Sequence, residues 1–275
     1  MREPTWIRWL RRATLAFFAV LVGVPLYVMV VTSLEPLGNV GESFSWLPSR
    51  LTPAAYADMW STVPLGRYLA NSLVVGAATT VLALLVAVPA GYAVARGRFV
   101  GRRPFVLLLL ATQAAPGLLF LVPLFLVYAE VGETTGVALI GTPTGLVLTH
   151  LTFAVPLSTW LVATHVEGLP QELEDAARVD GAGPLRVLVH VVVPGAAPAI
   201  AVVAVLTFAM SWGEVLFASV LTSGSGLTLP VGLHAYATQS TLLENQLTAA
   251  ALATSVPVLL AVLAVRRLLT RPLAP

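Results

Sequence analysis

The 275-residue sequence contains no cysteine and no lysine, and only 10% of its residues are charged. Without cysteine, the chain has no disulfide, no thiolate metal site and no cysteine nucleophile. Without lysine, it cannot build a phosphate-binding loop, because such a loop places a lysine on the phosphates of the nucleotide. The chain therefore cannot itself be an ATPase of the class that uses a phosphate-binding loop.

Apolar residues dominate instead: they make up 57% of the chain, and the mean hydropathy is +0.89. A soluble domain carries roughly 25% charged residues, well above the fraction found here. Six apolar segments come near the length of about 20 residues that a helix needs to cross a bilayer. These segments are 13–34, 68–95, 105–128, 143–166, 195–222 and 246–265. We therefore predict an all-α integral membrane protein, surrounded by lipid, with six transmembrane helices in a single domain over 1–275.

The first apolar segment follows several arginines, a pattern shared with secretory signals. It is longer than the 7–15 apolar residues usual for a signal, and no small-x-small cleavage site follows it. We expect an uncleaved first span.

The arginines predict how the chain is oriented in the membrane. Thirteen of the fifteen lie at the N-terminus, between the second and third segments, between the fourth and fifth segments, or at the C-terminus. Only Arg50 and Arg67 fall in the other gaps. Because cytoplasmic loops carry an excess of arginine, we predict that both termini and the segment 167–194 are cytoplasmic.

The segment 167–194 is a polar island between the fourth and fifth apolar segments. Glu174 and Asp175 precede Arg178, an order that suits a helix dipole and allows a Glu174–Arg178 pair four residues apart. Gly181 is a favourable end for this helix, because glycine tolerates the left-handed conformation of a helix terminus. Pro184 is typical of a first helical position. The pattern predicts two short helices hinged at Gly181.

This segment resembles the signature loop of the membrane-spanning subunits of ABC importers, which runs Glu-Ala-Ala, three residues, Gly, nine residues, then Ile-x-Leu-Pro. Here the match is Asp175-Ala176-Ala177, then Gly181, then nine residues, then Val191-Val192-Val193-Pro194. Aspartate replaces glutamate, and valines replace isoleucine and leucine. Because Glu174 directly precedes Asp175, either carboxylate fits the one that the family uses to meet its ATPase.

Two further motifs resemble the carbohydrate branch of that family, in particular the smaller membrane subunit of maltose-type importers. They are Tyr92-Ala93-x-Ala95-Arg96 at the end of the second segment and Ser211-Trp212-Gly213-Glu214 in the fifth. Relatives commonly have Trp-Asn where this chain has Trp212-Gly213, so that amide contact is missing. The resemblance implies a type I ABC importer permease fold with a cytoplasmic coupling-helix loop, in the inner (plasma) membrane of a bacterium.

The resemblance also implies what this subunit works with. The expected partners are a second, homologous permease subunit, two copies of a cytoplasmic ABC ATPase and an extracytoplasmic substrate-binding protein; no nucleic acid is expected. ATP and Mg would be bound by the ATPase, so we expect no cofactor and no enzymatic activity in this chain. The implied ATPase-coupling residues are Glu174, Asp175, Ala176, Ala177, Asp180, Gly181 and Leu185.

Glu214 is the carboxylate that we place deep within an apolar segment. A charged group at that depth costs about 2.5–3.5 kcal/mol on insertion scales, which makes it a candidate for function. It faces the substrate pathway, pairs with the partner subunit, or lies nearer the outer surface than its place in the segment indicates. Ser211, Trp212 and Asn71 are further pathway candidates; Trp212 either stacks on a sugar ring or packs in the core, and Asn71 bonds either a neighbouring helix or the substrate. The four histidines are not spaced as metal ligands, so we expect no metal site.

Two other classes of protein compete with the permease interpretation. A subunit of a secondary transporter driven by an ion gradient would use several intramembrane acids or unwound helices, whereas this chain offers one deep carboxylate. An intramembrane enzyme would need a nucleophile with its base, or a metal set, within the spans. The apolar segments hold no fixed cation, which favours a neutral sugar or polyol as the substrate, although relatives also carry glycerol phosphates.

Overall fold

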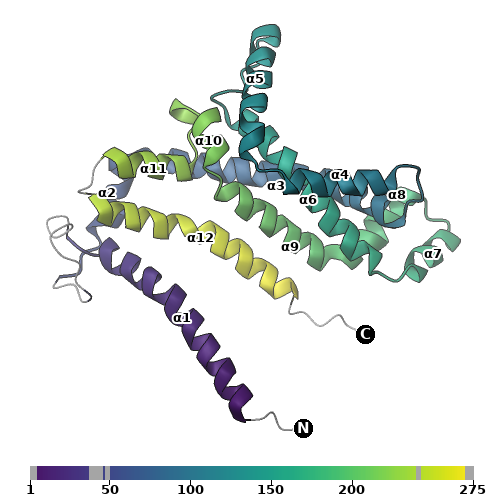
Figure 1. The fold of residues 1–275 in the computed structure, drawn as a ribbon, viewed down its shortest axis with the longest axis horizontal. Helices are drawn as coiled ribbons and strands as arrows, with labels where there is room; N and C mark the ends of the chain where they lie inside the picture. Colours follow the sequence, from purple (N-terminus) through teal and green to yellow (C-terminus); the bar gives the residue numbers. More distant parts are fainter. Residues whose placement is uncertain (1–4, 37–45, 47–49, 240–242, 270–275) are drawn as a thin grey trace. The chain divides into compact units, whose positions relative to one another are not determined.

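The computed structural model describes residues 5–36, 46, 50–239 and 243–269, and the regular elements in this part of the chain are all helical. Figure 1 shows them in order. They are α1 (Thr5–Ser33), α2 (Ala54–Thr62), α3 (Leu65–Arg96), α4 (Arg102–Ala114), α5 (Leu118–Thr135), α6 (Pro143–Glu167), α7 (Glu172–Val179), α8 (Pro184–Val187), the π-helix η1 (Leu188–Val192), α9 (Val193–Trp212), α10 (Leu216–Leu221), the 3₁₀ turn η2 (Gly224–Gly226), α11 (Leu229–Gln239) and α12 (Glu244–Leu269).

Six helical segments of the described chain are long and apolar enough to cross a membrane, which confirms the predicted all-α membrane architecture. They are Thr5–Ser33, Leu65–Arg96, Leu118–Thr135, Pro143–Glu167, Pro184–Trp212 and Glu244–Arg266. Most of their side chains are not buried by the rest of the chain. Lipid or a partner subunit is therefore needed to cover these apolar surfaces.

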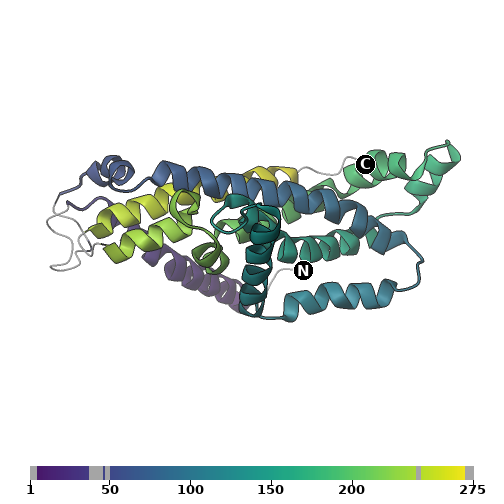
Figure 2. The ribbon, with the colours of Figure 1, turned by 90° about the horizontal axis from the view of Figure 1, so that it is seen from above.

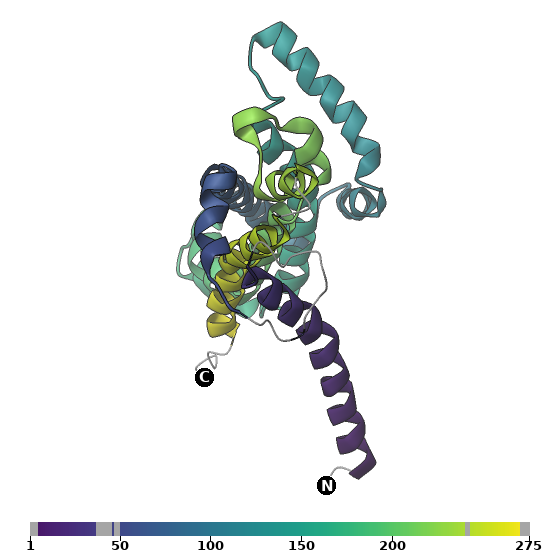
Figure 3. The same ribbon diagram turned by 90° about the vertical axis from the view of Figure 1, so that its left-hand side faces the viewer.

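The third span differs from the predicted 105–128, because the helix is interrupted. The helix α4 ends at Ala114, Ala115 is extended, and α5 begins only at Leu118. Pro116 explains the break, since proline disfavours a helical conformation in the residue before it and has no N–H to continue the ladder. The two helices run in different directions (Figures 1 and 3), and only α5 is long enough to span.

The fifth span also differs from the predicted 195–222. It begins earlier, because α8, η1 and α9 follow one another without a break as a 29-residue segment from Pro184 to Trp212. The second short helix predicted in the loop is therefore the start of this span. Pro194 cannot donate to the carbonyl four residues back, and the Val193 N–H bonds the Leu188 carbonyl five residues back, which produces the π-turn.

The described chain falls into two compact units. The first comprises 1–66 and 232–256, and the second comprises 67–231 and 257–275, in each case as far as the residues are described. Within the first unit, the Tyr56 hydroxyl lies 3.0 Å from Ser33 Oγ, and the Asn245 amide donates to the Glu35 carbonyl at 3.0 Å. These bonds attach α2 and the start of α12 to the end of α1.

The second unit has two apolar cores along the helix α6. One core is formed by Val75, Tyr128, Leu139, Leu146, Val147, Phe217, Ala218 and Leu221. The other is formed by Val162, Val166, Val187, Val192, Ala196 and Val203. Gly91 of α3 lies against this second core so closely that a Cβ there would sit 2.8 Å from Val162 Cγ1. In the second unit, the short helix α7 projects beyond the ends of α3 and α6 (Figure 2).

Candidate functional site

The segment 167–194 folds as a short helix, a glycine turn and a second helical start. The helix α7 carries acidic residues in its first turn and Arg178 in its last. Gly181 follows with φ +84°, and Pro184 begins α8. The positive φ confirms the predicted left-handed glycine after the first helix. It directs the chain back toward the fifth span.

The two neighbouring carboxylates of α7 differ in burial, although both contact Arg178. Glu174 is only 2% exposed, and it accepts hydrogen bonds from Arg96 Nε at 2.8 Å, the Tyr92 hydroxyl at 2.9 Å and Arg178 Nη2 at 3.1 Å. Asp175 is 60% exposed and pairs with Arg178 Nη1 at 2.6 Å. Of the two carboxylates that the sequence left open, Asp175 is thus the one available on the surface.

Arg178 lies between these acids, outside the membrane spans. Its hydrogen bond to the Tyr92 hydroxyl, reinforced by Asp175 and Glu174, holds the pKa of its guanidinium above the ordinary value. Arg178 therefore stays positively charged at every physiological pH. The pair with Glu174, predicted from the four-residue spacing, is confirmed.

The outer face of this segment is apolar as well as acidic. Val179 is 88% exposed and Leu185 is 74% exposed, whereas Ala177 packs against the core of α6 and α9. A shallow cavity of about 500 Å³ opens on the same side of the turn; it is lined by Gly181, Gly183, Pro184, Leu185, Arg186, Val189 and His190. Of the predicted coupling residues, five lie on the surface: Asp175, Ala176, Asp180, Gly181 and Leu185.

A second cavity of about 280 Å³ lies among α3, α6, α9 and the break between α4 and α5. It is lined by Thr79, Thr112, Gln113, Ala115, Gly117, His150, Phe153, Ala154, Thr207, Met210, Ser211, Glu214 and Phe217. Ser211 Oγ lies 2.7 Å from His150 Nδ1, and Glu214 Oε2 lies 3.5 Å from His150 Nε2. Hydroxyl, amide and imidazole groups thus line one cavity together with aromatic rings.

Glu214 is not inside a continuous helix, which corrects the prediction. The helix α9 ends at Trp212, and Glu214 lies in the turn before α10. Its carboxylate accepts hydrogen bonds from the N–H groups of Phe217 at 2.8 Å and Ala218 at 3.0 Å. The first N–H groups of a helix have no partner within the helix, and these two bonds satisfy two of them.

The other two predicted pathway residues do not line this cavity. Trp212 is buried and packs on Phe208, with ring centroids 5.4 Å apart. The Asn71 amide donates to the carbonyls of Ser225 and Leu227, each at 2.8 Å. Both side chains are engaged in contacts within the chain.

Of the residues that line the cavity, the sequence predicts only Ser211 and Glu214 as pathway residues, and Thr79 and His150 are among those it does not predict. Thr79 is fully buried, and its Oγ1 has no hydrogen-bond partner among the described residues. His150 was dismissed as a metal ligand, although a histidine within an apolar segment is itself a signal of function. Its partners Ser211 and Glu214 are more than sixty residues away in sequence, so only the fold brings them together.

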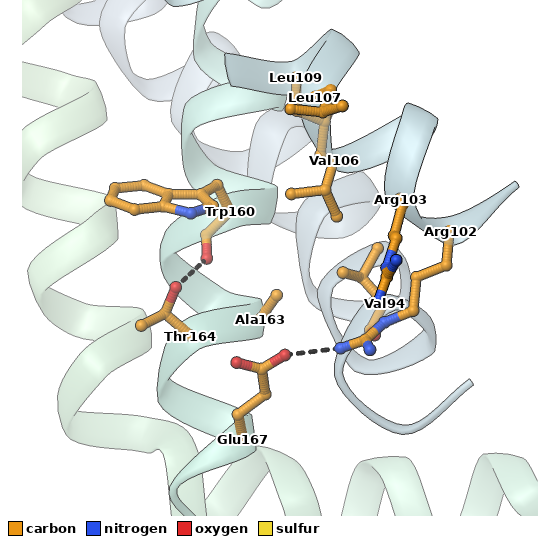
Figure 4. A pocket seen from close by; sticks show the side chains of 10 residues that line it. All are labelled: Val94, Arg102, Arg103, Val106, Leu107, Leu109, Trp160, Ala163, Thr164 and Glu167. Carbon is orange, nitrogen blue, oxygen red and sulfur yellow. Dashed lines mark hydrogen bonds and ion pairs between the residues drawn. The ribbon is translucent and has the colours of Figure 1, made fainter. Parts of the chain in front are cut away.

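A third cavity, of about 400 Å³, lies between the ends of α3, α4 and α6 (Figure 4). Its walls are largely apolar and include Trp160 of α6 and Val106 of α4. At its rim, Arg102 donates from Nε to the Val94 carbonyl and from Nη2 to Glu167 Oε1, both at 2.7 Å. Both partners of this ion pair are largely exposed to solvent, at 42% and 50%.

Comparison with known proteins identifies the family to which the chain belongs. Residues 87–273 match the model of a family described as binding-protein-dependent transport system inner membrane component. The chain is 32% identical to a diacetylchitobiose uptake system permease protein of Streptomyces coelicolor over 90% of this chain and 81% of the relative. It is also 32% identical to a trehalose transport system permease protein of Mycobacterium tuberculosis over 94% of each chain.

Among solved structures, the fold matches a chain of a bacterial ABC transporter involved in the import of alginate. The TM-score is 0.78 at 22% identity, over 97% of this chain and 99% of the other. At this identity the likeness shows the fold, which is that of an ABC importer permease.

Proposed function

The chain belongs to the family of binding-protein-dependent transport system inner membrane components, and from that premise we propose how it works within a sugar importer. It is a multi-pass, non-enzymatic permease subunit of the sugar ABC transporter type. It forms half of the translocation pathway for a neutral sugar or related polyol. The segment 167–194 couples it to a separate ATPase.

The outward face of α7 and α8 is the observation that carries this proposal. Asp175 and the exposed apolar side chains of Val179 and Leu185 stand on one projecting segment. Exposed apolar groups rimmed by charge are typical of a surface that binds a protein. ATP binding draws two ATPase subunits together, the docked segments follow, and the attached spans move between inward-open and outward-open states.

The cavity beside His150 is our candidate for the substrate pathway in this subunit. None of the described residues that line it carries a fixed positive charge, and several carry hydroxyl or amide groups. Such groups match the hydroxyls of a neutral sugar better than a phosphate, and Phe153 and Phe217 offer apolar faces for a sugar ring. Thr79 Oγ1 has an unused hydrogen-bonding capacity here.

The remaining partners follow from the family. A second, homologous permease subunit supplies the other half of the pathway, two ATPase copies bind ATP and Mg, and an extracytoplasmic binding protein delivers the substrate. We place both termini and the segment 167–194 in the cytoplasm, in agreement with the arginine distribution.

Uptake into proteoliposomes tests this function. The whole importer is reconstituted with its binding protein, which is first screened by thermal shift against neutral disaccharides and polyols to choose the labelled probe. We expect uptake that requires ATP on the ATPase side and persists when ionophores abolish the ion gradients. Uptake driven by an imposed proton or sodium gradient without ATP would instead establish the secondary-transporter alternative.

A further inference from the structure

Glu174 is the most buried carboxylate among the described residues, and it does not face the proposed ATPase. Its partners Tyr92 and Arg96 come from the last turns of α3, whereas Arg178 comes from its own helix α7. Arg96 donates further, from Nη2 to the Leu169 carbonyl at 2.7 Å. The last residue of the Tyr92-Ala93-x-Ala95-Arg96 motif therefore contacts the segment that precedes α7.

We propose that this network, made of Glu174, Tyr92, Arg96 and Arg178, transmits the motion of the coupling segment to α3. The inference rests on the proposed function. It adds α3 to α6 and α9 as a third span that the coupling segment moves. Along the chain, α7 is preceded by α6 and is followed by the continuous segment of α8, η1 and α9. The helix α3 is not adjacent to α7 in sequence, and the Glu174 network supplies the polar contacts that hold its last turns to α7. Tyr92 and Ala95 of α3 also pack on the apolar core that Ala177 of α7 contacts.

Burial makes this attachment strong. An ionised carboxylate shielded from water is stable only when charged and hydrogen-bonding partners replace its solvent. Glu174 has three such donors within 3.1 Å, two of them guanidinium groups. Separating α7 from α3 would deprive Glu174 of two of its three donors, Tyr92 and Arg96, which is strongly unfavourable for a carboxylate shielded from water. The exposed pair Arg102–Glu167 at the same end of the unit lacks this property, because water screens it.

The attachment has a consequence at the proposed pathway. The helix α3 is continuous from Leu65 to Arg96 and carries Thr79, which lines the cavity with His150. Further toward α7, Gly91 allows α3 to pack directly on α6. A displacement of α7 therefore moves one wall of the cavity through α3 and another through α6. Glu174 is a positioning residue in this account, and it does not touch the substrate.

Glu174→Gln in the whole reconstituted importer tests the proposal. Glutamine keeps the size of the side chain and one acceptor oxygen but loses the charge. We expect the complex to assemble and hydrolyse ATP, while uptake per ATP hydrolysed falls about tenfold, within the usual range of coupling between sites. The matched control Arg102→Gln removes the exposed pair with Glu167 from outside the coupling segment, and its uptake per ATP should stay within about twofold of wild type.

These readouts separate transmission from stability. If Glu174 is only structural, less complex is recovered but each complex keeps its normal uptake per ATP, and the proposal is overturned. If the wild-type importer shows no ATP-dependent uptake, the proposed function fails. An unchanged ratio in Glu174→Gln beside an active wild type refutes only the link through α3.

A crosslink provides the positive test, because the chain contains no cysteine of its own. The double variant Arg96→Cys, Glu174→Cys should be uncoupled, and a short bifunctional thiol reagent that forms cleavable disulfides should restore coupling until a reductant is added. Blocked transport in the crosslinked form would mean that the two ends separate during the cycle, which contradicts the proposal.

Discussion

Adjacent residues on a helix can have unrelated roles, as Glu174 and Asp175 show. Consecutive side chains of an α-helix point about 100° apart. Here that rotation takes Glu174 into the core beside α3 and leaves Asp175 on the surface. The sequence showed two candidate carboxylates but could not rank them, because the ranking depends on Tyr92 and Arg96, some eighty residues earlier.

Glu214 illustrates the same dependence. Its depth in an apolar segment was visible in the sequence, whereas its role as the cap of α10 was not, because nothing in the hydropathy marks the end of α9. Both carboxylate oxygens accept backbone N–H groups. Glu214 therefore holds the turn that borders the cavity, and of the two predicted pathway residues that line it, Ser211 is the one left to meet a substrate.

Glu214→Ala should lower the stability of the protein. The variant leaves the N–H groups of Phe217 and Ala218 without their acceptor, and the loss of such a cap costs about 1 kcal/mol. We expect the unfolding temperature of the detergent-purified subunit to fall by a few degrees. Tryptophan fluorescence is used to monitor unfolding. Glu130→Ala, at an exposed site on α5, is the control and should leave it unchanged. Normal stability of Glu214→Ala together with lost uptake would contradict the capping role and favour direct substrate contact.

At the scale of elements, hydropathy predicted that six spans exist but not where helices break. Several prolines stay inside helices, namely Pro25, Pro89, Pro123, Pro156, Pro198 and Pro257. Pro116, in contrast, ends one. Pro116 differs from these prolines in being followed directly by glycine, Gly117, which weakens a helix further. The breaks at Pro116 and Gly213 both lie beside the cavity, so the features that shape the candidate site were those least visible in the sequence.

The glycine turn between α7 and α8 is an element that the sequence did predict. Gly181→Val should abolish uptake while the subunit still reaches the membrane. A Cβ at this position meets no atom within 4 Å, but φ is +84°. A left-handed conformation costs a residue with a side chain about 1–2 kcal/mol. Valine would therefore favour another backbone conformation, which changes the direction of α8. Uptake and the amount of subunit in purified membranes are the two measurements.

Gly181→Asn is the matched variant, because asparagine tolerates the left-handed region better than other residues. It should retain much more uptake than Gly181→Val. Equal loss in both variants would show that an added side chain on the docking face, and not backbone strain, causes the defect.

At the scale of the molecule, the second unit connects the candidate cavity to the coupling segment by continuous helices. His150 lies near one end of α6, and Glu167 is its last residue. They are separated by seventeen positions, which correspond to about 25 Å of helix. Since α7 follows directly, a movement of the segment 167–194 reaches the cavity along α6, as well as along α9 and, by our inference, α3.

The orientation of the chain is the prediction that belongs to this scale. Because the chain has no cysteine, single cysteines can be placed at two exposed positions, Val100 in the α3–α4 loop and Val137 between α5 and α6. The excess of arginine beside Val100 predicts that it is cytoplasmic, and the span α5 places Val137 outside. In spheroplasts, a membrane-impermeant maleimide should label Val137→Cys at once and Val100→Cys only after permeabilisation.

The same experiment fixes the side on which ATP must act. The span α6 separates Val137 from the segment 167–194, so an external Val137 puts α7 and Gly181 in the cytoplasm, where an ATPase can reach them. The opposite labelling pattern would place α7 outside the cell. A cytoplasmic ATPase could not then dock on Asp175 or Leu185, and both the coupling role of this segment and the transmission through Glu174 would have to be abandoned.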